Sequence, residues 1–164
     1  MSVVGIDLGS LSTVVAVARN KGIDVICNDV SNRATPSLVT FAKLQRFIGE
    51  GAKTMEISNF HDTVSSLIRL VGRDFNDPDI TRESKFVNCA LVDQDNQVAA
   101  QVSFKDQTHT FTYTQILAMF LNHVSKYTSA ELKAPVNDCV ISCPGWFTEK
   151  QRRAILDAAE ISYL

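Results

Sequence analysis

Residues 3–10 read V-V-G-I-D-L-G-S, an apolar strand that carries one carboxylate, Asp7, to its end and then turns at Gly9. A second strand-like run, residues 13–18, follows almost at once, so the two segments are expected to pair as a hairpin. The connecting residues 9–12 would expose successive backbone N–H groups, which form an anion-binding concavity in a tight turn. A nearby aspartate can hold hydrated Mg²⁺, so this hairpin suits a metal-bound polyphosphate. An ordinary β-turn closed by glycine and serine is the alternative interpretation.

The composition is that of an ordinary globular protein. The 164 residues are 45% hydrophobic and 21% charged, and a chain of this length can bury a sizeable core. The formal net charge is −2 and no basic cluster is present, so the sequence favours neither nucleic acid nor an anionic membrane as a partner. No apolar run approaches the ~20 residues of a membrane-spanning helix, and the N-terminus enters a strand without a signal sequence.

The cysteines and histidines are scattered along the chain without the spacing of a metal site. Cysteines in apolar, strand-like runs behave as small hydrophobes, so we expect buried free thiols. Cys139 and Cys143 would face the same side of a strand, but C-x-x-x-C without further ligands does not indicate a zinc site. Reduced thiols without a signal sequence predict a cytoplasmic protein. The residues concerned are Cys27, Cys89, Cys139, Cys143, His61, His109 and His123.

Hydrophobic periodicity and turn residues predict the remaining elements, which by themselves define only a mixed α/β class. Residues 49–72 are predicted to be helical because apolar residues recur at i, i+3, i+4 and i+7. Two capping boxes, T-x-x-Q at Thr112 and at Thr148, predict the N-termini of two further helices. The expected strands are 23–27, after a turn at 20–22, and 36–41, 109–113 and 137–143, together with 86–92 and 98–104, which are predicted to pair as a hairpin around residues 93–96. The expected helical segments are 49–72, with a buried face of Val64, Leu67, Ile68 and Val71, and helices from 112 to about 132 and from 148 to 159, while residues 74–84 are expected to form a polar loop with one helical turn.

Three motifs together resemble the heat-shock protein 70 superfamily. G-I-D-L-G at 5–9 resembles the first phosphate loop that this superfamily shares with actin and sugar kinases, and N-D-V-S-N-R-A-T-P-S at 28–37 looks like its N-x-x-S-N-R-x-T-P-S stretch. C-P-G-W-F-T-E-K-Q-R at 143–152 looks like V-P-x-W-[YF]-T-x-x-Q-R. The tryptophan and threonine of this segment resemble the heat-shock protein 110 branch, and residues 1–33 resemble its fungal members. The similarity runs from residue 3 to about 161.

The resemblance implies an α/β fold, a ribonuclease-H-like lobe of the actin and heat-shock ATPase type that is incomplete in this chain. Within this N-terminal lobe, residues 1–164, a sheet subdomain would consist of residues 1–38 and 111–164. Residues 39–110 would form a smaller inserted α+β subdomain. Compared with the family, the chain lacks the second phosphate loop, a later metal-facing carboxylate, the adenosine-binding lobe, the peptide-binding domain and the helical lid.

The resemblance also implies a nucleotide site. Asp7 would contact the Mg²⁺ of bound ATP or ADP through water, and Gly9, Ser10, Leu11 and Ser12 would form the phosphate loop. Leu11 departs from the polar residue usual in the family. This departure removes one hydroxyl contact but leaves the backbone donors in place, so binding is expected to be weakened and not lost.

A second departure from the family concerns hydrolysis. Residues 63–72, T-V-S-S-L-I-R-L-V-G, resemble T-V-x-x-x-K-R-x-x-G, so Ile68 stands where the family has a phosphate-contacting lysine. An aliphatic side chain cannot stabilise the transferring phosphoryl group, so ATP binding is predicted in preference to hydrolysis and no catalytic residue is assigned. The alternative is that Ile68 simply packs in the core. Arg69 follows it, rotated ~100° around a helix.

Three residues late in the chain lie at the position of the superfamily's interdomain switch, and two of them, Pro144 and Arg152, match its pattern. Pro144, Trp146 and Arg152 lie where a proline and a nearby arginine communicate the nucleotide state to neighbouring domains. Taken without the resemblance, the same residues are a strand-terminating proline, a core tryptophan and a solvated helix arginine.

The function implied is that of an ATP-binding co-chaperone. Such a protein would act as a nucleotide exchange factor for heat-shock protein 70 and would hold unfolded polypeptides, while bound ATP closes two lobes and preorganises a partner surface. The alternatives are an ATP-hydrolysing heat-shock protein 70-type chaperone and an inactive truncated product. The chain alone is expected to bind ATP poorly and to leave apolar surface uncovered.

Overall fold

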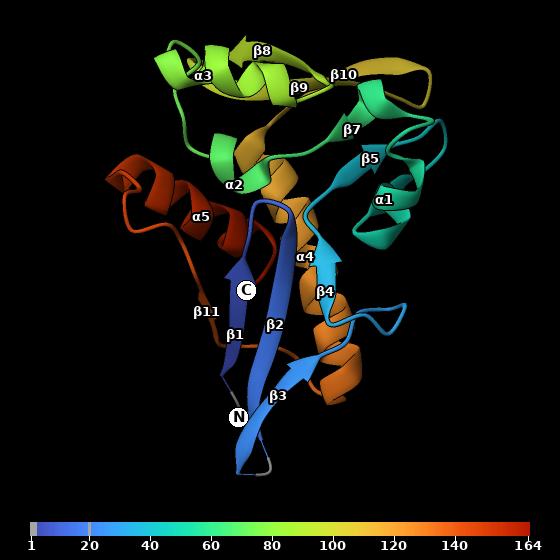
Figure 1. Cartoon of the computed structure of the whole chain (residues 1–164), viewed down its shortest axis with the longest axis vertical. Coiled ribbons are helices and arrows are strands. Elements are labelled where there is room, and N and C mark those ends of the chain that lie inside the picture. Colours follow the sequence, from blue (N-terminus) through green and yellow to red (C-terminus); the bar gives the residue numbers. More distant parts are fainter. Residues whose placement is uncertain (1–2, 20) are drawn as a thin grey trace.

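The largest sheet is built around the N-terminal hairpin. In the computed structural model, which describes residues 3–19 and 21–164, β1 (Val4–Leu8) and β2 (Ser12–Arg19) are antiparallel neighbours, as the sequence predicts. β3 (Gly22–Ile26) lies beside β2, and β11 (Cys139–Ile141) runs parallel to β1 on the opposite side. β4 (Ala34–Pro36) pairs with the start of β2. Strands from both ends of the chain therefore share one sheet (Figure 1).

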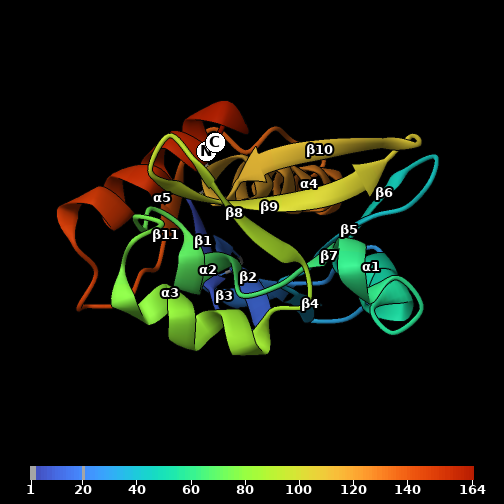
Figure 2. The ribbon, with the colours of Figure 1, turned by 90° about the horizontal axis from the view of Figure 1, so that it is seen from above.

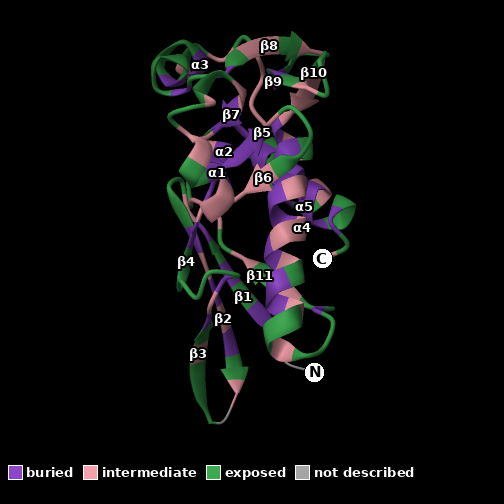
Figure 3. Cartoon of the chain, turned by 90° about the vertical axis from the view of Figure 1, so that its right-hand side faces the viewer, coloured by how far each residue is buried: buried purple, intermediate pink, exposed green. Residues whose placement is uncertain are grey.

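The two longest helices begin at the capping boxes that the sequence predicts. At the start of α4 (Tyr113–Leu132), Gln115 N donates to Thr112 Oγ1 at 3.3 Å and Thr112 N donates to Gln115 Oε1 at 2.9 Å. Thr148 makes the same reciprocal bonds at the start of α5 (Glu149–Ile161). The two helices pack against each other, and a buried stripe runs along α4 beside the sheet (Figure 3). Both predicted helix starts are confirmed.

Two small sheets and several short helices lie at the end of the molecule opposite β3 (Figure 1), and Figure 2 shows them from above. One sheet has the order β10-β9-β8, and its β8–β9 hairpin closes through Asp95 and Asn96, whose φ angles are 54° and 61°. Consecutive residues with positive φ are typical of two-residue hairpin turns, so the predicted hairpin is confirmed. The other sheet has the order β6-β5-β7. The elements are β5 (Val39–Phe41), β6 (Arg46–Ile48), α1 (Glu50–Met55), η1 (Phe60–Asp62), β7 (Thr63–Val64), α2 (Leu67–Leu70), α3 (Pro78–Glu83), η2 (Ser84–Phe86), β8 (Ala90–Gln94), β9 (Gln97–Phe104) and β10 (Gln107–Thr112).

The prediction that residues 49–72 are helical throughout is wrong. The chain forms α1, then the β7 strand, whose Val64 pairs with Val39 of β5, and only then the single turn α2. Ser66 between them has a φ of 57°, a left-handed conformation that interrupts any helix. The four apolar residues of the predicted buried face are nevertheless buried, because strand pairing buries Val64 as completely as a helix face would. Periodicity alone therefore could not distinguish the two structures.

Smaller differences concern boundaries and burial. Pro78 begins α3 instead of interrupting a loop, and Asp77 caps this helix by accepting the amide of Asp79 at 2.9 Å. All four cysteines are free, but only Cys89 is buried and the other three are half-buried. Asn20, part of the predicted turn, lies outside the described residues. Within the described ranges, no helix is long and apolar enough to cross a bilayer.

Candidate functional site

The tip of the β1–β2 hairpin lines a groove of about 850 Å³. The tip contributes its three outermost residues, and the opposite wall comes from the turn at α2 and from α3 and η2. Figure 1 shows the tip pointing toward α2. The groove therefore brings residues near position 10 against residues 65–86. Its lining is Ser10, Leu11, Ser12, Ala34, Pro36, Leu38, Lys53, Glu56, Ser65, Ser66, Arg69, Glu83 and Phe86.

A close approach of the backbone to itself fixes the hairpin tip. A Cβ on Gly9 would lie 2.3 Å from the carbonyl oxygen of Ser12, so this position accepts only glycine. The buried Ser37 holds the tip from the end of β4, because its Oγ donates to Gly9 O at 2.9 Å and its N donates to Leu11 O at 2.9 Å. Thr13 Oγ1 lies 3.0 Å from the same hydroxyl.

These contacts leave donors available at the tip. Ser37 engages carbonyl oxygens, whereas the backbone amides of Ser10 and Leu11 have no acceptor among residues 3–19 and 21–164. The Leu11 side chain is 87% exposed and takes no part in the packing. Free amides in a rigid turn are the arrangement that binds an anion. Ser37, the last residue of the T-P-S motif, is a supporting residue that the sequence interpretation had not assigned to the site.

Asp7 lies at the end of β1 but is not among the residues that line the groove. Its Oδ1 accepts a hydrogen bond of 2.8 Å from Ser142 Oγ, which in turn accepts the amide of Leu8 at 3.1 Å. Ser142 N donates to Ile6 O at 2.9 Å, which anchors the serine beside β1. The side chain of Asp7 is exposed, and its second oxygen accepts no hydrogen bond from the described residues.

The opposite wall of the groove presents charge from side chains. Ile68 is 2% exposed and packs in the core, while its neighbour Arg69 lines the groove. Both guanidinium edges of Arg69 donate to the largely buried carboxylate of Glu83, with Nε to Oε2 at 2.7 Å. These hydrogen bonds raise the pKa of Arg69. Neighbouring residues of a helix point in different directions, so Ile68 lies in the core and Arg69 lies in the groove.

The second groove cation, Lys53, is also paired. Its Nζ lies 2.5 Å from Glu56 Oε2. Because both lining cations already contact carboxylates, an incoming anion must share or displace those partners, whereas the amides of the tip require no such exchange. The groove is thus preorganised for an anion on one wall only.

A magnesium ion bound through water is compatible with this geometry. The described residues contain no group of three or more histidine, cysteine or carboxylate side chains that could enclose a metal directly. Mg²⁺ at a nucleotide commonly uses one or two protein carboxylates and otherwise water and phosphate oxygens. The exposed carboxylate of Asp7, with one oxygen oriented by Ser142, fits such a role.

The three predicted switch residues lie in α5 and in the loop before it, and none of them lines the groove. Arg152 of α5 reaches back to the loop before the helix, donating from Nη2 to Gly145 O at 2.9 Å and from Nε to Phe147 O at 3.1 Å. Pro144 O accepts the amide of Phe147 at 3.1 Å, which closes the loop. Trp146 is 81% exposed, so its interpretation as a core residue is wrong. The loop and α5 therefore hold together through Arg152.

Comparison with known proteins agrees with the motifs. The family model described as Hsp70 protein matches residues 3–164. Heat shock protein hsp88 of Neurospora crassa is 54% identical over 164 residues, covering 100% of this chain and 23% of the relative. A heat shock protein homolog of Naumovozyma castellii is 46% identical over 161 residues, covering 98% of this chain and 24% of the relative.

A heat shock protein homolog of Saccharomyces cerevisiae is 44% identical over 161 residues, covering 98% of this chain and 23% of that protein. The chain thus spans about a quarter of the length of these relatives. A family match over nearly the whole chain, together with this level of identity, establishes the relationship. The chain belongs to the heat-shock protein 70 family, and within it to the heat-shock protein 110 branch.

Proposed function

We propose that this chain supplies the phosphate-binding wall of an ATP site in a cytoplasmic co-chaperone that binds ATP without depending on its hydrolysis. The observation that carries the proposal is the arrangement of α2, where Ile68 is buried and Arg69 is tied to Glu83. No free cation therefore meets the phosphates from this wall within the described residues. The amides of the hairpin tip remain available to bind an anion.

In this proposal, ATP or ADP binds with its phosphates against Gly9, Ser10, Leu11 and Ser12, and Asp7 holds the Mg²⁺ through water. Bound Mg²⁺ neutralises phosphate charge, which compensates in part for the absent lysine. Asp7 and the tip lie on one rigid hairpin, so the ion and the phosphates are positioned together. Arg69 is a secondary contact that must exchange Glu83 for a phosphate oxygen.

The fold that we propose for this role is a ribonuclease-H-like lobe. Residues 1–38 and 111–164 would form its main part, and residues 39–110 an inserted smaller subdomain. The five-stranded sheet, drawn from residues 4–36 and 139–141, and the two smaller sheets, drawn from 39–112, support this division. Pro144, Trp146 and Arg152 would transmit the state of the nucleotide to further domains.

The complete co-chaperone would accelerate nucleotide exchange on heat-shock protein 70 and hold unfolded polypeptides. ATP would act by stabilising the closed arrangement of two lobes, and this arrangement would present the partner surface. The family relationship supports a chaperone role. Free cysteines support the cytoplasmic location.

The test separates binding from turnover in the purified full-length protein. We expect calorimetry to show Mg²⁺-dependent ATP binding, phosphate release to stay near the uncatalysed rate, and release of labelled ADP from a separate heat-shock protein 70 to accelerate. Asp7→Asn should weaken binding. ATP hydrolysis at the rate of an Ile68→Lys variant, with both proteins folded by circular dichroism, would overturn the claim that turnover is dispensable.

Arg69 in the groove is the one observation that favours an ATP-hydrolysing chaperone instead. A guanidinium can stabilise a transferring phosphoryl group where a lysine is missing. This alternative predicts turnover that a J-domain protein stimulates and that Arg69→Ala abolishes. If Arg69→Ala leaves a measurable turnover unchanged, this alternative fails.

The 164-residue polypeptide by itself should bind ATP weakly. Its groove is open and both lining cations are paired with carboxylates. Apolar side chains of β11 and α5 also remain exposed, including Val140 at 65% and Leu156 at 61%. Tight ATP binding by the monomeric 164-residue polypeptide in calorimetry would contradict this expectation, and an endogenous product of 18.1 kDa would favour the inactive truncated alternative.

A further inference from the structure

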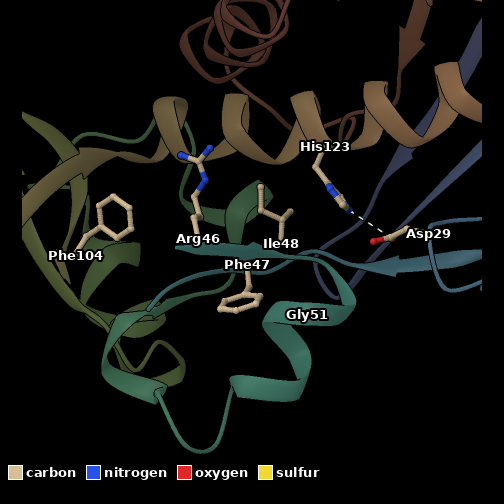
Figure 4. Close-up of a pocket in the computed structure, with 7 residues that line it drawn as sticks. All are labelled: Asp29, Arg46, Phe47, Ile48, Gly51, Phe104 and His123. Carbon is tan, nitrogen blue, oxygen red and sulfur yellow. Dashed lines mark ion pairs between the residues drawn. The ribbon is translucent and has the colours of Figure 1, made fainter. Parts of the chain in front are cut away.

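A second cleft, separate from the groove at the hairpin tip, lies between α4 and β6. Its volume is about 620 Å³, and it shares no lining residue with the groove. Figure 4 shows Arg46 and Ile48 projecting from β6 toward α4 and His123 descending from α4 toward Asp29. The cleft is lined by Asp29, Arg46, Phe47, Ile48, Gly51, Phe104 and His123.

Arg46 is the cation of this cleft and has no counter-ion. Within residues 3–19 and 21–164, no carboxylate lies within ion-pair distance of its guanidinium, and no acceptor takes the guanidinium N–H groups. Part of the side chain remains in solvent, yet the surrounding protein removes enough water to lower the pKa of Arg46 by desolvation. Desolvation of a charge without a compensating partner costs free energy, which an anionic group in the cleft would recover.

The other end of the cleft holds an imidazole and a carboxylate that do not satisfy each other. The Nε2 atom of His123 is buried without a hydrogen-bond partner, and Asp29 Oδ1 lies 3.7 Å away, too far for a hydrogen bond. Burial lowers the pKa of His123, and the carboxylate of Asp29 only partly opposes this effect. The side chain of Asp29 accepts no hydrogen bond from the described residues, so its charge is available to a ligand.

We propose that this cleft binds an extended peptide segment of another protein in which an acidic, an apolar and a basic side chain follow one another at alternate positions. The acidic side chain would meet Arg46, the basic side chain would meet Asp29, and the apolar residue would lie over Ile48. Arg46 and Ile48 are two residues apart on one face of β6, about 7 Å, and alternate side chains of an extended peptide have the same spacing.

Charge complementarity decides between this occupant and a small polyanion. A polyanion at Arg46 would meet repulsion from Asp29, whereas a dipolar segment satisfies both charges. The volume lies in the range of pockets that enclose small ligands or a few peptide residues. Phe104 at one end supplies an apolar surface for the continuing peptide. Recognition here depends on paired charges, which distinguishes it from the holding of apolar unfolded chains.

The test uses fluorescein-labelled, end-blocked peptides and fluorescence anisotropy with the full-length protein. The probe contains E-G-V-G-K between glycines, so that its three side chains share one face of an extended peptide, and the matched control contains Q-G-V-G-Q. We expect the E-G-V-G-K peptide to bind at least roughly tenfold more tightly than Q-G-V-G-Q, because each recovered charge contact is worth about a factor of ten. Equal affinity of the two peptides would overturn the proposal. Displacement of the labelled probe by inorganic phosphate at the same concentration as by unlabelled peptide would also overturn it.

Variants localise the binding to the cleft. Arg46→Glu and Asp29→Lys should each reduce affinity roughly tenfold, while the double variant should regain it because the peptide can lie in the reversed direction. Arg33→Glu, which changes an exposed arginine outside the cleft, is the matched control and should leave affinity unchanged. All three positions are exposed, and circular dichroism checks the folding of each variant. Unchanged affinity in both single variants, or no recovery in the double variant, would refute the assignment.

Discussion

The hairpin tip and the α2 turn form opposite walls of the same groove but present different chemistry to it. The tip offers backbone amides held in place by Ser37, and its outermost side chain, Leu11, points into solvent. The α2 turn offers side chains, of which Ile68 is buried and Arg69 is bound to Glu83. A backbone site tolerates the change of a side chain, whereas a side-chain site is lost with one substitution. In the proposed ATP site, the amides of the tip can therefore still bind phosphate when a side chain of the α2 turn changes.

The two walls also differ in what holds them in place. Hydroxyl and backbone hydrogen bonds fix the tip, and none of these groups changes charge between about pH 2 and 10. The α2 turn is held by an ion pair to Glu83, and Glu83 belongs to α3, which begins at the cap residue Asp77. Mutation and acid should thus affect the two walls differently.

The largest effect should come from Gly9→Ala. The new Cβ would lie 2.3 Å from Ser12 O, so the hairpin must open at the strand that anchors the sheet. We expect the free energy of unfolding, measured by urea denaturation, to fall by about 3 kcal/mol, together with loss of ATP binding.

Gly22→Ala is the matched control for this prediction. A Cβ at Gly22, the first residue of β3, meets nothing within 4 Å, so the change in stability should stay below about 1 kcal/mol. If the two substitutions cost the same, the tip is not held by the close approach described here.

The next largest effect concerns Ile68→Lys. The lysine would lose core contacts and would have to carry its ammonium past Arg69 to reach the groove, so we expect a loss of about 2 kcal/mol in urea denaturation. Ile68→Met, which keeps apolar volume, should cost less than about 1.5 kcal/mol. Saturating ATP should reduce the loss of stability in Ile68→Lys but not in Ile68→Met, since phosphate would pair with the ammonium. Equal stability of both variants without ATP would show that the α2 turn is not packed as described.

Local signals in the sequence predicted much of the fold. The first hairpin, the β8–β9 hairpin and both capping boxes depend on residues a few positions apart, and each is confirmed. The helical stretch at 49–72 failed because β7 is a strand only through its pairing with β5, a partner about 24 residues away that periodicity does not reveal.

The site was less accessible to prediction for the same reason. The motif residues at the tip lie where the sequence predicts them, at the end of the first strand. The residues that hydrogen-bond to them come from far along the chain, since Ser37 and Gly9 are 28 residues apart and Ser142 and Asp7 are 135 residues apart. The partner of Arg69 also depends on how α3 folds back on α2. Such contacts follow from tertiary packing and leave no pattern in one sequence.

Arg69→Ala tests whether the α2 wall contributes to binding at all. Removal of the guanidinium deprives the groove of a cation and leaves the carboxylate of Glu83 unpaired and close to the phosphates. We expect ATP affinity in calorimetry to fall about tenfold, equivalent to about 1.4 kcal/mol.

Arg82→Ala, an exposed arginine on α3 outside the groove, is the control and should change affinity by less than about 0.5 kcal/mol. Glu83→Gln should have the opposite effect on affinity from Arg69→Ala, because it releases the guanidinium. Unchanged affinity in both Arg69→Ala and Glu83→Gln would mean that the hairpin tip alone carries the contact.

The smallest effect should be the response of the α2 wall to acid. The amide of Asp79 donates to Asp77 and, with Arg73, holds the pKa of that carboxyl below its usual range. A lowered folded-state pKa contributes stability that is present above about pH 4 and is lost as the pH falls through the folded value. Between about pH 5 and 2 the unmodified protein should therefore lose about 1 kcal/mol more stability than Asp77→Asn, which keeps a cap without the charge. Asp106→Asn, at an exposed carboxylate, should show no such difference in urea denaturation at the two pH values. Because Glu83 lies at the end of the capped helix, an identical pH response in Asp77→Asn would mean that the charge of this cap does not stabilise the α2 wall.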